Sequence, residues 1–192
     1  MAKLQDYKAK DLVNILLDNC PQAFKFHGEV AMQLFLNNQF DLPSIVDLCV
    51  ERKHLTEVIT ALPNDIKLTY YNKNNHVLDT SQLVITEVVH ITVMNNTSLL
   101  LNIFIYDVAN GEWIFRLDNH VRLPQNNIYF HSLTWNVDYI KPEIVLMYDF
   151  LDNQNYHQSS SYKKVLDALS YYQFVILQTV VGEDKIKKCL NE

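Results

Sequence analysis

The sequence predicts an α/β (α+β) fold, in which a mixed sheet flanked by helices is followed by a C-terminal helical tail. Three observations support this prediction. A short aromatic strand, a tight turn, an amphipathic helix and a buried strand follow one another between Phe24 and Val50. Apolar runs separated by polar turns fill residues 88–116, and helical periodicity returns from Tyr139. We therefore expect an α/β domain at residues 1–135 and a helical tail at residues 136–192.

The first third of the chain alternates helices with strands. We expect a helix at residues 4–19, ended by Cys20-Pro21, and then a strand at Phe24–Phe26. A helix at residues 29–36 follows the turn at Gly28, a strand is expected at residues 45–50, and a helix at residues 54–62 ends at Pro63. Strand, helix and strand in this order predict a right-handed crossover and a mixed or parallel sheet.

The middle third is typical of an antiparallel meander. Apolar runs at residues 88–94, 99–106 and 113–116 are separated by two polar segments. The second of these segments contains Asn110-Gly111, and this pair favours a two-residue turn in which both residues have positive φ. We therefore predict a β-hairpin over residues 99–116 that turns at Asn110-Gly111.

Helical patterns fill the last third. From Tyr139 the pattern returns to helix, and Pro142 suits the first position of that helix. Residues 154–161 read as a polar loop in which Ser160 or Ser161 caps a helix containing Val165 and Leu169. A helix at residues 171–181 is then closed by Gly182, and a short basic helix follows.

Composition excludes several classes of function. A net charge of -6 disfavours nucleic-acid binding, and three glycines are too few for a P-loop or a dinucleotide turn. We expect no membrane span and no export signal, because no apolar run approaches about 20 residues. Three widely spaced cysteines give no disulfide framework, so the expected location is the cytoplasm. The seven histidines show no HxH or HExxH metal-binding spacing.

Several ordered segments together resemble a known family. They are residues 24–50, residues 102–118 with their Trp113 and Arg-x-Asp, and Tyr139-Ile140-Lys141-Pro142-Glu143. These segments resemble the nucleotidyltransferase superfamily, which has the polymerase-beta-like fold, and in particular the bacterial-type aminoglycoside and lincosamide nucleotidyltransferases. The resemblance implies a nucleotidyltransferase-like sheet with a helical tail packed beside it.

The chain departs from the family where catalysis would take place. The family has a Gly-Gly turn, an Asp-x-Asp strand that holds magnesium, and a third carboxylate on a later strand. Here the corresponding residues are His27-Gly28, Ile45-Val46-Asp47 and Asn102. The resemblance thus implies Asp47 as the catalytic and metal-binding residue, His27 and Gly28 at the nucleotide, and Ile45 and Asn102 lining the cleft. Where the family has a basic residue after the Pro-Glu helix start, this chain has Asp149.

Two of these residues also have a structural interpretation. Ile45 takes the place of the first metal-binding carboxylate on the same strand face, so Asp47 is better read as an acid paired with a neighbouring side chain. His27 has a side chain where the family has glycine, and a side chain there obstructs close approach of a phosphate. We therefore expect the ring of His27 to fill that space. Asp47 and Asn102 are predicted to lie on adjacent strands and to face one cleft.

Three functions follow from these residues. The first is a catalytically eroded relative, or pseudoenzyme, which needs no cofactor and binds a small molecule or a protein partner through the old cleft. The second is an active adenylyltransferase-like enzyme that uses Mg²⁺ and ATP, with Asp47 assisted by Glu29 or Asp41. The third is a purely structural interaction protein. Neither the ligand, nor the partner, nor the oligomeric state follows from the sequence.

Overall fold

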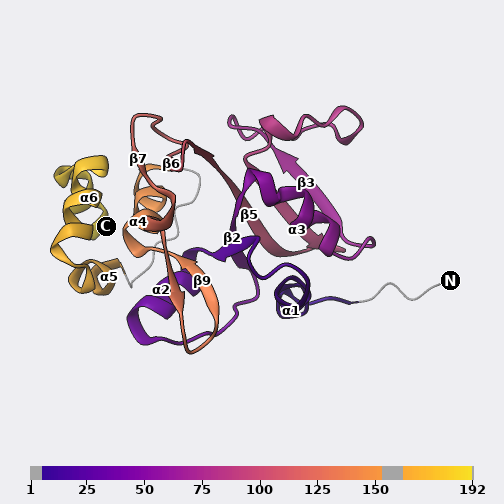
Figure 1. Ribbon diagram of the computed structural model, residues 1–192, viewed down its shortest axis with the longest axis horizontal. Helices are drawn as coiled ribbons and strands as arrows, with labels where there is room; N and C mark the ends of the chain where they lie inside the picture. Colours follow the sequence, from indigo (N-terminus) through magenta and orange to yellow (C-terminus); the bar gives the residue numbers. More distant parts are fainter. Residues whose placement is uncertain (1–5, 153–161, 192) are drawn as a thin grey trace.

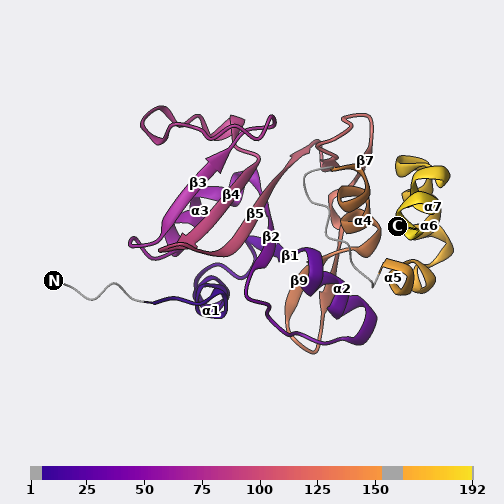
Figure 2. The ribbon, with the colours of Figure 1, turned by 180° about the vertical axis from the view of Figure 1, so that it is seen from behind.

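The sheet of this protein is mixed and open, and helices flank it (Figures 1 and 2). The computed structural model describes residues 6–152 and 162–191. Within these residues nine strands form one sheet, in the order β3-β4-β5-β2-β1-β9-β8, with β6 pairing to β5 and β7 pairing to β6. The strands are β1 (Phe24–Phe26), β2 (Val46–Glu51), β3 (Lys67–Tyr71), β4 (His90–Asn95), β5 (Ser98–Ala109), β6 (Glu112–Ile114), β7 (Arg122–Pro124), β8 (Tyr129–Ser132) and β9 (Val137–Ile140).

The last four helices lie together at one end of the molecule. The helices are α1 (Ala9–Asn19), α2 (Gly28–Asn37), α3 (Leu55–Ala61), α4 (Pro142–Leu151), α5 (Tyr162–Ala168), α6 (Tyr171–Val181) and α7 (Glu183–Asn191). Figures 1 and 2 show α5, α6 and α7 beside α4 at one end of the molecule, with β3 and β4 at the other. Short 3-10 turns occur at Arg52–His54, Thr80–Gln82, Ile85–Glu87 and Gln125–Asn127.

The C-terminal helices attach through α4. Glu143 and Gln173 are both buried, and the Gln173 Nε2 amide donates to Glu143 Oε2 over 2.7 Å. Burial raises the pKa of Glu143, and the bond from Gln173 opposes that rise. Gln173 also completes a capping box with Ser170, the N-cap of α6. The helical tail is therefore joined to α4 by a satisfied buried polar pair.

The two faces of the central strands differ in polarity. Val46, Leu48 and Val50 of β2 are fully buried, whereas the alternate residues are Asp47, Cys49 and Glu51. These three alternate residues lie beside Asn102, Phe104 and Tyr106 of the parallel neighbour β5. Because side chains alternate across a strand, the residues of β2 and β5 separate into an apolar face that packs into the core and a more polar face.

The predicted hairpin is confirmed. β5 pairs antiparallel with β6, and the turn between them has positive φ at Asn110 (54°) and Gly111 (79°). No helix occurs between residues 99 and 116, all of which the structure describes. The remaining predicted helices and strands of the first 116 residues are also found, with small changes at their ends. The first helix begins at Ala9 rather than residue 4, and residues 1–5 lie outside the described part.

Other expectations are corrected. The strand expected at residues 45–50 begins at Val46, so Ile45 lies in the bend that precedes it. β1 and β2 are antiparallel, so α2 does not form a crossover between parallel strands. The parallel pairs are β2 with β5 and β1 with β9, which makes the sheet mixed as predicted.

Part of the sheet was not predicted. The helix begins at Pro142, as its suitability for the first helical position predicted, but residues 137–140 before it are β9 and complete the sheet. The strands β3, β7 and β8 were also missed. The expected polar loop at residues 154–161, with its Ser160 or Ser161 cap, lies outside the described residues. The division into domains at residue 135 stays a prediction; it falls within the β8–β9 hairpin.

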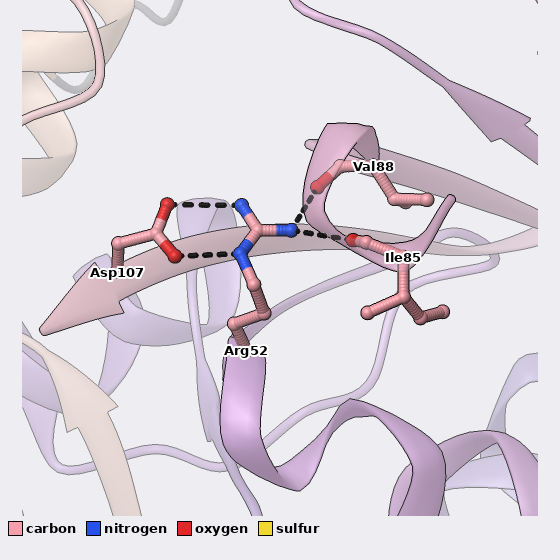
Figure 3. Close-up of polar contacts among 4 residues, drawn as sticks. All are labelled: Arg52, Ile85, Val88 and Asp107. Atoms are coloured by element: carbon pink, nitrogen blue, oxygen red, sulfur yellow. Dashed lines mark hydrogen bonds and ion pairs between the residues drawn. The ribbon is translucent and has the colours of Figure 1, made fainter.

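Arg52 ties three segments together at the end of β2 (Figure 3). Its Nε and Nη2 donate to the two oxygens of Asp107 over 2.6 and 2.9 Å. Its Nη1 donates to the carbonyls of Ile85 and Val88 over 2.8 and 2.6 Å. A planar guanidinium fits this fork geometry, so Arg52 fixes β5 and the turn before β4 relative to β2.

No helix within residues 6–152 and 162–191 is both long enough and apolar enough to cross a bilayer.

Candidate functional site

A cleft of about 800 Å³ lies over the polar face of β2 and β5. The start of α2, the loop before β2, and helices α4 and α5 form its other walls. The residues of the cleft that carry polar or aromatic groups include His27, Glu29, Gln33, Asp47, Asn102, Phe104, Tyr106, Trp113, Arg116, Tyr148, Asp149, Tyr162 and Lys164. This volume is typical of a small-molecule site.

Asp47 and Asn102 face this cleft together, as predicted. They are register partners on the parallel strands β2 and β5, and the Asn102 Nδ2 amide donates to Asp47 Oδ1 over 2.9 Å. Ile45 also lines the cleft, with 41% of its surface exposed, although it precedes the strand. The geometry therefore brings together all three residues that the family pattern places at its metal-binding carboxylates.

His27 closes one wall of the cleft as the N-cap of α2. Its Nδ1 accepts from the Gly28 N–H over 2.6 Å, and its ring lies against Phe104 and Tyr148 at centroid distances of 5.5 and 5.8 Å. Burial lowers its pKa to about 4, so the imidazole is neutral near pH 7. A neutral ring that already holds the first amide of the helix is poorly suited to binding a phosphate.

Position 28 favours glycine for two reasons, its backbone conformation and the close approach of Asp47. Its φ is +57°, and a Cβ at this position would lie 2.5 Å from Asp47 Oδ2. The carboxylate of Asp47 therefore lies directly against the first residue of α2. An anion at a helix N-terminus is stabilised by the unpaired amides and by the helix dipole.

Replacing Gly28 with alanine is expected to lower the free energy of unfolding by about 2–3 kcal/mol, because left-handed backbone strain adds to displacement of Asp47. Gly111→Ala is the matched control, since Gly111 has a φ of +79° but no atom within 4 Å of the added Cβ. The control should cost only about 1–2 kcal/mol. Urea denaturation of both variants provides the comparison. Equal costs would show that the close approach of Asp47 has no energetic consequence.

Asp149 is a cleft carboxyl, besides Asp47 and Glu29, that the sequence did not assign to the site. Tyr162 Oη donates to its Oδ2 over 3.1 Å. Its pKa is raised to about 7, mainly by burial and further by the charges of Asp47 and Asp152, while the bond from Tyr162 opposes the rise. The sequence signal was an acid in the largely apolar helix α4, six residues after the acid of its first turn, Glu143. A carboxyl group whose pKa is raised to about 7 thus lies in the same cleft as Asp47.

Arg116 stands where this cleft meets a smaller pocket of about 260 Å³. Its Nη2 pairs with Asp152 Oδ2 over 2.9 Å, and its guanidinium lies 5.8 Å from the ring centroid of Tyr148. Burial raises the pKa of Tyr148 far above its ordinary value, so the phenol stays neutral. Because of its ion pair with Asp152, the positive charge of Arg116 is already balanced.

The other acids considered from the sequence occupy different positions. Glu29 lines the cleft, where its Oε1 accepts from Gln33 Nε2 over 3.0 Å. Asp41 is exposed in the loop after α2 and is not among the cleft residues. In the part of the chain that the structure describes, no three His, Cys, Asp or Glu side chains form a group that could hold a metal ion. Cys20 and Cys49 are buried free thiols.

The chain was compared with known proteins. No family model matches it, and no curated protein matches it. The Megavirus polyadenylate synthase is similar to it in structure, with 10% identity, a TM-score of 0.43, and coverage of 99% of this chain and 37% of that one. A protein from H. pylori described as a nucleotidyltransferase shows 14% identity, a TM-score of 0.35, and coverage of 95% and 90%.

The chain spans little more than a third of the polyadenylate synthase.

Proposed function

We propose that this chain is a nucleotidyltransferase-fold protein that binds a small organic molecule in its cleft and does not transfer nucleotides with magnesium. The hydrogen bond between Asn102 and Asp47 is the observation that carries this proposal. The family pattern expects a second strand carboxylate at Asn102, and an amide there satisfies Asp47 instead of sharing a metal ion with it. The cavity volume favours a small molecule over a protein partner.

The cleft residues do not fit Mg²⁺ and ATP. Two divalent ions and a triphosphate require several carboxylates and unpaired cations. Asp47 is bonded to Asn102, Ile45 is apolar, and Asp149 retains its proton up to about pH 7. Of the two cations that line the cleft, Arg116 is paired with Asp152, which leaves Lys164 alone to meet a triphosphate. No step through a metal or a nucleotide is therefore part of this proposal.

One observation favours the second candidate, an active transferase. Asp149 has a pKa of about 7, which suits a general base, and it shares the cleft with Asp47. An active enzyme would use Asp149 to accept the proton of an acceptor hydroxyl. It would still lack the metal ligands that such a reaction needs.

Catalysis is tested by calorimetry with Mg-ATP and by an adenylation assay on aminoglycosides and lincosamides. We expect neither saturable heat nor turnover from the wild type. An Ile45→Asp, Asn102→Glu double substitution restores carboxylates at both positions and is expected to gain Mg-ATP binding. Robust wild-type turnover that Asp47→Ala abolishes would favour the active transferase.

Small-molecule binding can be followed with the two tryptophans. Trp113 lines the cleft, whereas Trp135 lies outside it and donates its indole N–H to the Asn38 carbonyl over 2.8 Å. With 19F-labelled tryptophan, cleft ligands from a fragment library should shift the Trp113 resonance and leave that of Trp135 unchanged. A library that moves neither signal, or only that of Trp135, would contradict the proposed cleft function.

A further inference from the structure

Three aromatic rings stand in a row on the polar face of β3, β4 and β5. His90 stacks on Tyr71 on one side and on Phe104 on the other, with ring centroids 5.2 and 4.9 Å apart and interplanar angles of 25° and 11°. Each ring belongs to a different strand, and His90 is the register partner of both neighbours. The stack therefore fixes the plane and the direction of the imidazole.

A directed chain of hydrogen bonds runs from this imidazole to the cleft carboxylate. Asp47 as a carboxylate only accepts, so Asn102 must turn its Nδ2 amide towards Asp47, over 2.9 Å. The Asn102 carbonyl then faces His90 Nε2 at 3.2 Å, and a carbonyl needs a donor. Nε2 must therefore carry the hydrogen. The direction of these two hydrogen bonds follows from the carboxylate, which can only accept. The carboxylate therefore also fixes which way the Asn102 amide is turned.

We infer that His90 is a positioning residue that holds Asp47 in the cleft by donating to Asn102. The inference takes the cleft as the binding site proposed above. Without a donor, the partly buried carbonyl of Asn102 lacks a partner, and its side chain loses the restraint that keeps its amide on Asp47. Asp47 would then move away from the single orientation in which it meets a ligand.

The protonation of the His90 ring agrees with this role. Burial lowers its pKa, the bond with Asn102 and the charge of Asp152 raise it, and Arg116 lowers it. A neutral imidazole has one N–H, and the bond to Asn102 places that hydrogen on Nε2.

The test uses NMR on the ligand-free protein, so it can fail while the proposed function stands. The wild type should show His90 as the Nε2–H tautomer, with unprotonated Nδ1. His90→Phe keeps the ring stack and removes the donor, and it should speed hydrogen exchange of the Asn102 side-chain amide about tenfold. His90→Gln offers an amide donor at the Nε2 position and should restore slow exchange. His54→Phe, at an exposed histidine paired with Glu57 on α3, should change nothing at Asn102.

Two outcomes would overturn the inference. The first is an Nδ1–H tautomer in the wild type, which is measured without any variant. The second is slow Asn102 exchange retained in a folded His90→Phe protein. If His90→Phe and His90→Gln both exchange fast, His90 acts through packing rather than as a donor, and the inference also fails.

Discussion

Replacing Arg52 with alanine is expected to lower the free energy of unfolding by about 3 kcal/mol. The guanidinium makes four hydrogen bonds, two to Asp107 and two to the carbonyls of Ile85 and Val88 (Figure 3). Its side chain is only 18% exposed, so water cannot fully replace it at those carbonyls. Removing one partner leaves the others without their donor, which costs more than the bonds themselves contribute.

Urea denaturation should separate the parts of this effect. Arg52→Lys keeps the charge but cannot bridge Asp107 and both carbonyls, so it should lose part of the stability. Arg122→Ala removes an exposed arginine that lies 4.0 Å from Glu112 and donates to the Asn119 carbonyl over 3.2 Å, and it should cost less than about 1 kcal/mol. If Arg52→Ala proves as mild as Arg122→Ala, the bonds of Arg52 do not hold these segments together.

Local patterns predicted the centre of this fold well. Alternation along β2 and β5 places Asp47 and Asn102 on one face, and the pairing of these strands brings them within hydrogen-bond distance. The Asn110-Gly111 turn was equally predictable, because few residue pairs adopt positive φ at two successive positions. Each of these features depends on residues close to one another in sequence, or on a regular period.

The missed strand β9 depends on a partner far away in the sequence. β9 is held in the sheet by β1, through Phe26 and Tyr139, and by β8. Its four residues alternate too briefly to distinguish a strand from the start of the following helix. The direction of β2 relative to β1 was wrong for a related reason. The loop of residues 38–45, which no periodic pattern describes, lets the chain return antiparallel to β1.

The candidate site was predictable only on its strand side. Asp47, Asn102, Ile45, His27 and Gly28 all line the cleft. Asp149 joins them because α4 packs across the cleft, and this packing follows from tertiary contacts between segments far apart in sequence. The roles of these residues in binding or catalysis stay predictions.

Asp149→Asn should make the protein more stable at pH 8 by about 3 kcal/mol and leave it nearly unchanged at pH 4. Burial, with the charges of Asp47 and Asp152, raises the pKa of Asp149 from its ordinary 3.8 to about 7. Asparagine has nearly the same shape, carries no charge, and still accepts from Tyr162 Oη. The substitution therefore removes the cost of ionising a desolvated carboxyl while it keeps the hydrogen bond.

The sign of the pH dependence follows from proton binding. Between about pH 4 and pH 7 the unfolded chain has lost the proton of Asp149, while the folded protein still holds it. The folded state thus binds more protons in this window, so the contribution of Asp149 to stability falls as pH rises. Below pH 4 both states are protonated and the difference vanishes. Above pH 7 the full cost is present.

Thermal and urea unfolding of both proteins from pH 4 to pH 8 measure this difference. Asp167→Asn is the control, because Asp167 is exposed and pairs with Lys163 on α5, so its replacement relieves no desolvation. A stability difference between Asp149→Asn and wild type that does not grow with pH would mean that Asp149 is not desolvated. If the difference does grow with pH, the wild-type protein keeps, inside the cleft, a carboxyl group that lowers its own stability. Asparagine would fit at position 149 without this loss of stability. The presence of aspartate there is therefore better explained by what the cleft binds than by folding.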